Sequence, residues 1–381
     1  MTTLATTGVI SGLENAVAAA TRLSSVNGQI GELIIAGFPL EELAGRATFE
    51  EMLYLLWHDR LPTAAELVPF TQELAALRPL PTPTLDLLRA AAKAQVPTMD
   101  ALRMGAGTLN LDLPQGDPYR QAQAIVARMP TIVAAYWRLR HGQAPLAPRP
   151  DLNHSANYLY MLNGSVPHAA RVRGLDTYLI AVGDHGLNAS TFTARTIIST
   201  QSDLVSAIVG AIGALKGPLH GGAPGPALDM VFEIGAAAKA ESYLRAKIEA
   251  GERLMGFGHR VYKVRDPRAE VLSRAAERMY AADGDMALYE LAKEVEATAV
   301  TLLAEYKPGR NLQTNVEFYT ALLLHGLELP TDLFTPTFAI GRTGGWLAHC
   351  FEQQENGRLI RPQSTYIGET QRKWVPLEQR A

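Results

Sequence analysis

The chain has 381 residues, 47% of them hydrophobic, which is enough for one large domain or two unequal domains with a substantial core. Its 35 basic and 38 acidic residues give a formal net charge of -3, which argues against nucleic acid or an anionic membrane surface as a partner. The single cysteine, Cys350, excludes an internal disulfide, and no Cys/His spacing of the zinc-binding type occurs, so we expect no metal site.

The same features predict a soluble protein of the cytoplasm. One cysteine suits a reducing compartment. The first residues, MTTLATTGVISGLENAV, lack a basic region followed by a continuous apolar core, which is the pattern of a signal peptide. No uncharged apolar run approaches the roughly 18 residues that a membrane-spanning helix needs, so we expect no membrane partner.

Most segments carry the apolar period of an α-helix, and the first clear case is TFEEMLYLLWHDRLP at 48–62. Thr48 with Glu51, and Thr63 with Glu66, match the capping-box pattern that begins a helix. Further helices are expected at residues 85–94, 118–140, 151–162, 191–215, 226–238, 268–281, 286–305, 316–325 and 342–354.

Strand signals are few, so the sequence predicts a mostly α fold. They are confined to GELIIAGF at 31–38 and RLIRP at 358–362. Proline and glycine interrupt the helical pattern at 79–83, 145–150, 217–226 and 255–258.

A histidine between glycines and a proline is the first candidate for chemistry. In GALKGPLHGGAPG, His220 directly precedes the helix that Pro226 would begin, where free backbone N–H groups disfavour an imidazolium and favour a neutral, hydrogen-bond-donating ring. The glycines do not form a nucleotide phosphate loop, because neither GxxxxGK[ST] nor a strand followed by GxGxxG is present. The alternative is a turn histidine whose hydrogen bonds are satisfied by the backbone.

A second glycine-flanked histidine, His259, opens a basic stretch in LMGFGHRVYKVRDPR. Guanidinium groups suit carboxylates and lysines suit phosphates, so this stretch could bind an acidic metabolite and a phosphorylated cofactor. A charged run is often only a solvated helix face, but Gly256, Gly258 and Pro267 favour a loop. The basic residues after the histidine are Arg260, Lys263, Arg265 and Arg268.

Two further segments supply polar candidates. GDHGLNASTFTAR places His185 beside Asp184, ahead of residues that could simply cap the next helix. AIGRTGGWLAHCFEQ contributes Arg342 near small residues, and NGRLIRP contributes Arg358 and Arg361, either of which could be an ordinary surface residue.

Glu317 lies in TNVEFYTALLLHG, a stretch with no other charge. Poor solvation at the start of an apolar helix raises the pKa of a carboxyl group and makes its carboxylate a stronger base. A carboxylate base with two neutral histidines and several arginines suits proton abstraction next to a carbonyl group, with the histidines stabilising the enolate oxygen.

These segments, in this order, resemble the citrate synthase family. The resemblance covers nearly the whole chain: GLENAVAAATRLSSVNGQIGEL and GFPLEELA, then DHGLNASTFTAR, GPLHGGAPG, GFGHRVYKVRDPR, TNVEFYT and GRTGGWLAHCFEQ, with RP and a Tyr-x-Gly near the end. It implies a mostly α, two-domain homodimer. Residues 1–219 and 331–381 would form the large domain, and 220–330 a small inserted domain, with the site in a cleft that closes over oxaloacetate before acetyl-CoA reacts.

The resemblance also implies a role for individual residues. His220 matches the histidine that hydrogen-bonds the thioester carbonyl, Glu317 the acid that takes a proton from the acetyl methyl group, and His259 the histidine that polarises and protonates the ketone of oxaloacetate. The implied oxaloacetate ligands are His185, Arg268, Arg342 and, supplied to the partner subunit's site, Arg361. The implied CoA-binding residues are Lys263, Asn315, Met255, Gly256 and Gly258. Acetyl-CoA would be a co-substrate, with no permanently bound cofactor.

The chain departs from the family pattern at the base itself. The residue in the NV-acid-FY context is commonly aspartate, whereas Glu317 has one more methylene. Two alternatives to citrate synthesis stay open: 2-methylcitrate synthesis from propionyl-CoA, because a methylene changes pocket energetics by only about 1–3 kcal/mol, and a related helical protein that binds metabolites or assembles without turnover.

Overall fold

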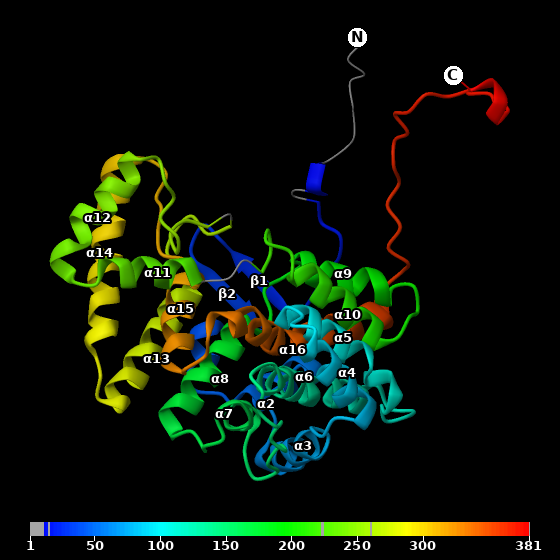
Figure 1. Ribbon diagram of the computed structural model, residues 1–381, viewed down its shortest axis with the longest axis horizontal. Coiled ribbons are helices and arrows are strands. Elements are labelled where there is room, and N and C mark those ends of the chain that lie inside the picture. The colour runs from blue at the N-terminus through cyan, green and yellow to red at the C-terminus, as the bar shows by residue number, and fades with distance from the viewer. Residues whose placement is uncertain (1–10, 14–15, 222–224, 260, 381) are drawn as a thin grey trace.

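The computed structural model describes residues 11–13, 16–221, 225–259 and 261–380. The described residues confirm a mostly α fold (Figure 1). The first helices are α1 Leu40–Leu43, α2 Phe49–His58, α3 Ala64–Ala76, α4 Thr82–Lys93, α5 Thr98–Gly107, α6 Pro118–Arg140, α7 His154–Asn163 and α8 Ala169–Gly183. The later helices are α9 Ala189–Ile198, α10 Leu204–Leu215, α11 Gly225–Ile234, α12 Ala237–Glu249, α13 Pro267–Asp283, α14 Ala287–Tyr306, α15 Val316–Gly326 and α16 Phe334–Asn356. Short 3₁₀ turns occur at Ser11–Leu13, Leu109–Leu111, Thr331–Leu333 and Leu377–Gln379.

The sheet is small and antiparallel, with β1 Ser24–Asn27, β2 Glu32–Ile35 and β3 Phe38–Pro39 in that order. The strand expected at 31–38 is split into β2 and β3, because Ala36 and Gly37 both adopt positive φ and turn the chain back on itself. β1 was not predicted. The strand expected at 358–362 is wrong, since these residues form no strand.

Several helix predictions are confirmed with small shifts, and both capping boxes form, at Thr48 for α2 and at Thr63 for α3. The single helix expected at 191–215 is wrong: it is α9 and α10, separated where Gln201 takes a positive φ and Asp203 caps α10. The helix expected at 226–238 ends at Ile234, because Gly235 takes a positive φ.

Helices α5, α8 and α12 were not predicted. For α8 the reason is that every residue of its last ten, from Gly174 to Gly183, is buried, so no polar face marks the helical period. The same reason applies to the start of α16, which begins at Phe334 and not at 342, and whose first apolar residues are also buried.

α16 is the central helix of the larger group of helices (Figure 1). It packs against α2, α6, α8, α9 and α10, and it carries the fully buried Trp346. α11, α12 and α14 lie at the opposite end of the molecule, and α13 and α15 lie between the two groups, with α13 packed on α8 (Figure 1). Segments far apart in sequence therefore meet around α16, α8 and α13.

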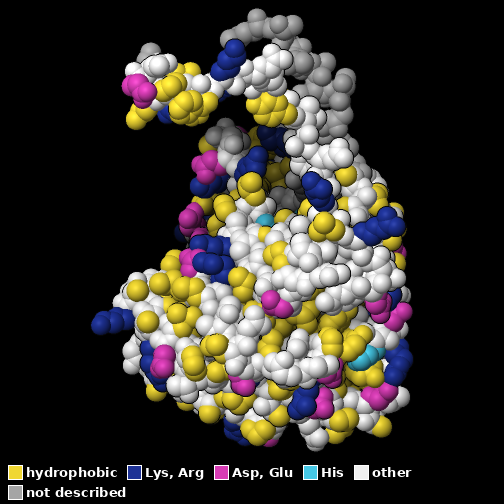
Figure 2. Space-filling view, turned by 90° about the vertical axis from the view of Figure 1, so that its right-hand side faces the viewer, with side chains coloured by type: hydrophobic (Ala, Val, Ile, Leu, Met, Phe, Trp, Pro, Cys, Tyr) yellow, Lys and Arg dark blue, Asp and Glu magenta, His cyan; other side chains and the backbone are white. Residues whose placement is uncertain are grey.

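The residues after α16 leave the body of the molecule. Figure 2 shows this C-terminal segment projecting away from the surface, with an open space between it and the body. Among the helices of the described ranges, none is long and apolar enough to cross a membrane.

Glycines let α16 approach the end of α8 closely. A Cβ built on Gly345 would lie 2.3 Å from the carbonyl oxygen of Gly183 and 3.0 Å from the Asp184 carboxylate. Because backbone atoms cannot move aside as a flexible side chain can, only glycine fits at position 345 without displacing the helix. This contact sets the position of the residues that follow α8.

We expect Gly345→Ala to destabilise the protein by about 1–3 kcal/mol through overpacking. The thermal unfolding midpoint, followed by circular dichroism, should fall by several degrees. Gly213→Ala is the matched control, since its Cβ would meet no atom nearer than 3.9 Å on an exposed part of α10, and it should raise stability by up to about 1 kcal/mol. An unchanged midpoint for Gly345→Ala would contradict the close approach.

Candidate active site

His220 is held at the start of α9. It lies in a tight turn after α10, in which its backbone N–H and that of Gly221 donate to Gly217 O, and its ring faces Ser190. The Ser190 backbone N–H donates to His220 Nε2 at 3.3 Å, and the Ser190 hydroxyl lies 2.7 Å from the same nitrogen. An N–H contact therefore forms with the first turn of α9, whereas the sequence predicted one with the helix that Pro226 would begin.

The hydrogen bonds of His220 determine its tautomer. The Ser190 backbone N–H can only donate, so Nε2 is its acceptor and the neutral ring carries its proton on Nδ1; the Ser190 hydroxyl, which also lies 2.8 Å from Asn188 Oδ1, then donates to Nε2. Burial, with the charge of Arg342, lowers the pKa of His220 to about 4. The ring is therefore neutral at pH 7 and presents Nδ1–H as a donor, as the glycine-rich motif predicted.

His259 is neutral for the same reasons but with the opposite tautomer. Its Nδ1 accepts from the backbone N–H groups of Val261 at 3.0 Å and Tyr262 at 3.1 Å, which leaves the ring proton on Nε2. Burial and the charge of Arg268 lower the pKa of His259 to about 4. His259 Nε2 and Arg268 Nη2 lie 3.4 Å apart. Because both are donors, an acceptor oxygen placed beside them would satisfy both.

His185 completes a group of aromatic side chains that includes Tyr262. His185 Nε2 and the Tyr262 hydroxyl are 3.0 Å apart, and the His185 and His259 ring centroids are 6.4 Å apart. Burial and the charges of Arg268 and Arg342 lower the pKa of His185 well below its ordinary value. The sequence analysis gave Tyr262 no role, and the only signal was an aromatic residue in an otherwise basic loop.

Two buried arginines lie beside these histidines. Arg268 is 5% exposed and pairs with Asp266, its Nη2 donating to Oδ2 at 2.8 Å and its Nε to Oδ1 at 3.1 Å. Arg342 is 2% exposed, and its Nε donates to Val182 O at 2.5 Å. Among the described residues no carboxylate forms an ion pair with Arg342.

The isolation of Arg342 has an electrostatic consequence. Burial lowers the pKa of its guanidinium to about 10, with the charge of Arg268 acting in the same direction and that of Asp184 opposing it. A buried cation without its own counter-ion is costly, so an anionic ligand that reached Arg342 and Arg268 would repay that cost.

Glu317 lies in the first turn of α15, where its backbone N–H donates to the cap residue Asn315. Its side chain is half-buried, and no side chain or backbone group of the described residues hydrogen-bonds its carboxylate. Burial raises the pKa of Glu317, and the charge of Arg268 partly opposes this effect. The carboxylate is thus a stronger base than a solvated glutamate, as its apolar context predicted.

A glycine loop is fixed against the start of this helix. Asn315 N–H donates to Gly256 O at 2.9 Å, and its side-chain Nδ2 donates to Gly258 O at 2.9 Å. Both glycines have positive φ, 86° and 81°. The Asn315 side chain is therefore used to cap α15 and to hold the loop, and it shapes the region more than it offers a free contact.

The other residues expected at the site are on the surface. Met255, at the edge of the glycine loop, is 39% exposed. The Lys263 side chain is also exposed, while its backbone N–H donates to Gly28 O at 2.8 Å. Arg361 is exposed in the C-terminal segment, outside the group formed by the other residues of this chain. Arg260 lies outside the described residues.

A network of hydrogen bonds around the buried Asp184 holds the residues next to His185 in place. Asp184 accepts from His349 Nε2 at 3.1 Å and from the Ser24 hydroxyl at 2.5 Å, and the same hydroxyl accepts from Gly186 N–H at 2.7 Å. Arg195 extends the network by donating to His349 Nδ1 at 3.0 Å. The sequence analysis did not identify His349 or Ser24, since nothing in their spacing connects them to Asp184.

No cluster of side chains that could hold a metal ion is found among the described residues. The arrangement offers a desolvated carboxylate base, two neutral N–H donors of fixed tautomer and two buried cations. Such groups can remove a proton next to a carbonyl and stabilise the enolate that forms.

We expect NMR of ¹⁵N-histidine-labelled protein to find the ring proton of His220 on Nδ1 and that of His259 on Nε2 at pH 7, because backbone N–H groups occupy the other nitrogens. Both rings should stay neutral until the pH falls to about 4. His220→Asn and His259→Asn assign the signals. An imidazolium signal from either ring at pH 7 would contradict the geometry.

Comparison with known proteins agrees with this chemistry. Residues 12–363 match the family described as "Citrate synthase, C-terminal domain". Citrate synthase 2 of Bacillus subtilis is 42% identical over 97% of this chain and 99% of its own length, and the 2-methylcitrate synthase of Shewanella oneidensis is 36% identical over 97% of each. The crystal structure of citrate synthase from Pyrobaculum aerophilum superposes with a TM-score of 0.88 at 39% identity, over 98% of this chain and 95% of that one. The chain belongs to the citrate synthase family.

Proposed function

We propose that this protein condenses acetyl-CoA with oxaloacetate and hydrolyses the resulting citryl-CoA to citrate and CoA. The observation that carries the proposal is a combination of three groups. Burial raises the pKa of Glu317, and two neutral histidines each keep one N–H for a substrate oxygen. A thioester methyl group is a very weak acid, so the base succeeds only if the enolate is stabilised as it forms.

Oxaloacetate binds to the buried arginines. Its two carboxylates bring negative charge to both arginines. Arg342 has no carboxylate partner among the described residues, and Arg268 has one, Asp266. The ketone oxygen takes a position beside His259 Nε2–H and Arg268 Nη2, where both groups can donate to it. His185 is the further oxaloacetate ligand, and Arg361 of the partner subunit is the last.

Acetyl-CoA reacts in the space beside oxaloacetate. His220 Nδ1–H donates to the thioester carbonyl while Glu317 takes a proton from the methyl group. The enolate carbon then attacks the ketone carbon of oxaloacetate, and the ketone oxygen takes the Nε2 proton of His259 as the new bond forms. Water hydrolyses the thioester, and CoA leaves. CoA itself is bound near Lys263 and the loop of Met255, Gly256 and Gly258, which Asn315 holds in place.

The active form is a homodimer of two-domain subunits, with residues 220–330 as the small domain and 1–219 with 331–381 as the large one. The extended C-terminal segment supports this assembly. It leaves the body and exposes large apolar side chains that a second subunit would cover, namely Leu359, Tyr366, Ile367, Trp374 and Leu377. We assign the protein to the cytoplasm, where both substrates and a reduced Cys350 are expected.

2-Methylcitrate synthesis from propionyl-CoA is the second candidate, because a 2-methylcitrate synthase is among the full-length relatives. The ratio of kcat/KM for acetyl-CoA and propionyl-CoA, at saturating oxaloacetate, distinguishes the two. A clear preference for propionyl-CoA would replace the first candidate.

Glu317→Gln should lower kcat by at least about 100-fold, because the amide cannot accept the methyl proton. Oxaloacetate binding, measured by calorimetry, should change little. The assay follows CoA release with a thiol reagent and exchange of the acetyl methyl protons in D₂O.

Glu317→Asp is the matched control, since it keeps a carboxylate that is one methylene shorter and should retain part of the activity. If Glu317→Gln exchanged methyl protons at the wild-type rate, Glu317 would not be the base.

Mixing two inactive variants tests the shared site. Glu317→Gln and Arg361→Gln subunits, unfolded and refolded together in equal amounts, should regain about a quarter of wild-type activity, because half the dimers are mixed and each of these has one intact site. Specific activity after separation from aggregates is the measurement. Recovery no greater than that of either variant refolded alone would mean that Arg361 does not act across the interface.

A further inference from the structure

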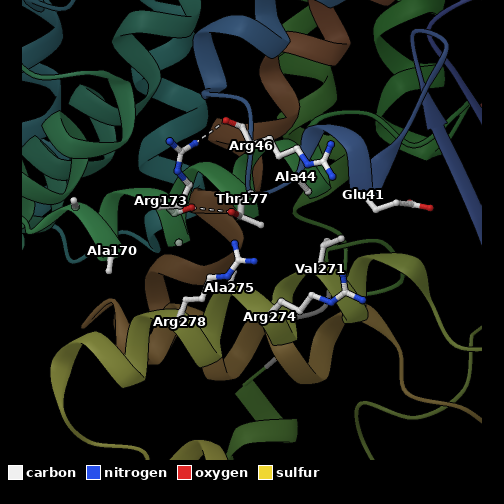
Figure 3. A pocket seen from close by; sticks show the side chains of 13 residues that line it. Glu41, Ala44, Arg46, Ala170, Arg173, Thr177, Val271, Arg274, Ala275 and Arg278 are labelled. Carbon is white, nitrogen blue, oxygen red and sulfur yellow. Dashed lines mark hydrogen bonds between the residues drawn. The ribbon is translucent and has the colours of Figure 1, made fainter.

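A cavity apart from the residues described above lies between α8, α13 and the connection from α1 to α2 (Figure 3). Its volume is about 460 Å³. Its charged lining comprises four arginines, Arg46, Arg173, Arg274 and Arg278, and one acidic residue, Glu41. In Figure 3, Arg278 extends from α13 toward the other two elements, Arg274 runs along α13, and the Glu41 carboxylate points away from Arg173 and Arg278.

The positive charge of this cavity is only partly neutralised. Arg46 pairs with Glu42, and Arg274 with Glu270, one helical turn away in each case and on the exposed surface, where such pairs are weak. Glu270 is also shared with Arg265 at 3.3 Å. Each of these two arginines is therefore held only weakly by its carboxylate partner.

The remaining two arginines have no carboxylate partner among the described residues. Arg173 Nη1 donates to the backbone oxygens of Arg46 at 3.1 Å and Ala47 at 3.0 Å, which fixes its guanidinium at the cavity edge. Arg278 forms no hydrogen bond or ion pair with any group that the structure describes. Since the whole chain has a net charge of -3, four arginines against one glutamate is a local feature of this cavity.

Arg278 reaches the point where the three elements meet. A Cβ built on Gly45 would lie 3.8 Å from Arg278 Nη1 and 3.9 Å from Thr177 Oγ1. Small side chains line the rest of the space, including Ala169, Ala170 and Ala275, and no aromatic ring is among the lining residues on which a nucleobase could stack. The cavity thus suits a compact charged group and not a nucleobase or other aromatic ring.

We propose that this cavity is a binding site for a compact anion with at least two negative charges, carried by phosphate or carboxylate groups. Guanidinium groups donate in parallel pairs to both kinds of oxyanion. The ligand would join α13 to α8 and to the α1–α2 connection.

The site is separate from that of oxaloacetate. Arg274 and Arg278 are on the same helix as Arg268, but they follow it by 6 and 10 residues, which corresponds to about 9 and 15 Å along the helix axis. The proposal therefore does not depend on the proposed function, and its test measures binding and not turnover.

Isothermal titration calorimetry with the full-length protein tests the site, with inorganic tripolyphosphate and tricarballylate as probes of the two oxyanion classes. The titrations are done with and without saturating oxaloacetate. We expect at least one probe to bind under both conditions, and Arg278→Gln to weaken that binding about tenfold or more by removing a charged donor. Arg274→Gln should also weaken it.

Arg120→Gln is the matched control, since Arg120 is an exposed helix residue that does not line the cavity, and it should leave binding unchanged. Binding of tripolyphosphate alone identifies a phosphate site, and binding of tricarballylate alone a carboxylate site. The proposal is overturned if neither probe binds, if Arg278→Gln binds as the wild type does, or if oxaloacetate abolishes the binding. Because Arg278 is exposed, its variant should fold normally, which circular dichroism checks.

Discussion

The Asp184 carboxylate is the constraint on which the geometry of the active site depends. It is fully buried where α8 ends, and burial alone would raise its pKa, but His349 and Ser24 lower it, so it stays ionised. Through Ser24 it also holds the backbone of Gly186. His185 lies between these two fixed residues. The backbone on either side of His185 is thus positioned by one buried charge whose partners come from a strand and from the central helix.

The close contact of α16 with α8 and the hydrogen-bond network around Asp184 both fix the positions of the site residues at the end of α8 and on α16. Gly345 brings the helix near Gly183, and this places His349 beside Asp184 and Arg342 beside Val182. The burial of Arg342 follows from that packing, and with it the cost of an uncompensated cation. In the proposed function, the anionic substrate supplies the counter-charge that Arg342 lacks, so binding favours a ligand that carries carboxylate groups.

The histidines show how backbone groups set chemical roles. His220 and His259 are both kept neutral by burial and by neighbouring arginines, yet they present different nitrogens, because Ser190 N–H meets Nε2 in one ring and two N–H groups meet Nδ1 in the other. Each ring therefore has a single direction in which it can donate. Glu317 completes the set as a carboxylate without a fixed hydrogen-bond partner among the described residues.

The sequence by itself determined the helical class, the capping of α2 and α3, and the kinds of side chain available at the site, because helical period, capping boxes and glycine-flanked histidines are local patterns. It also indicated a raised pKa for Glu317 from its apolar neighbours. Only the tertiary structure decided which N–H groups meet His220 and which residues support Asp184. These depend on contacts between segments up to 165 residues apart, such as Asp184 with His349, and no local pattern encodes such pairs. Buried helices such as α8 were missed for a related reason, since a helix covered on all sides by other segments has no polar face to show its period.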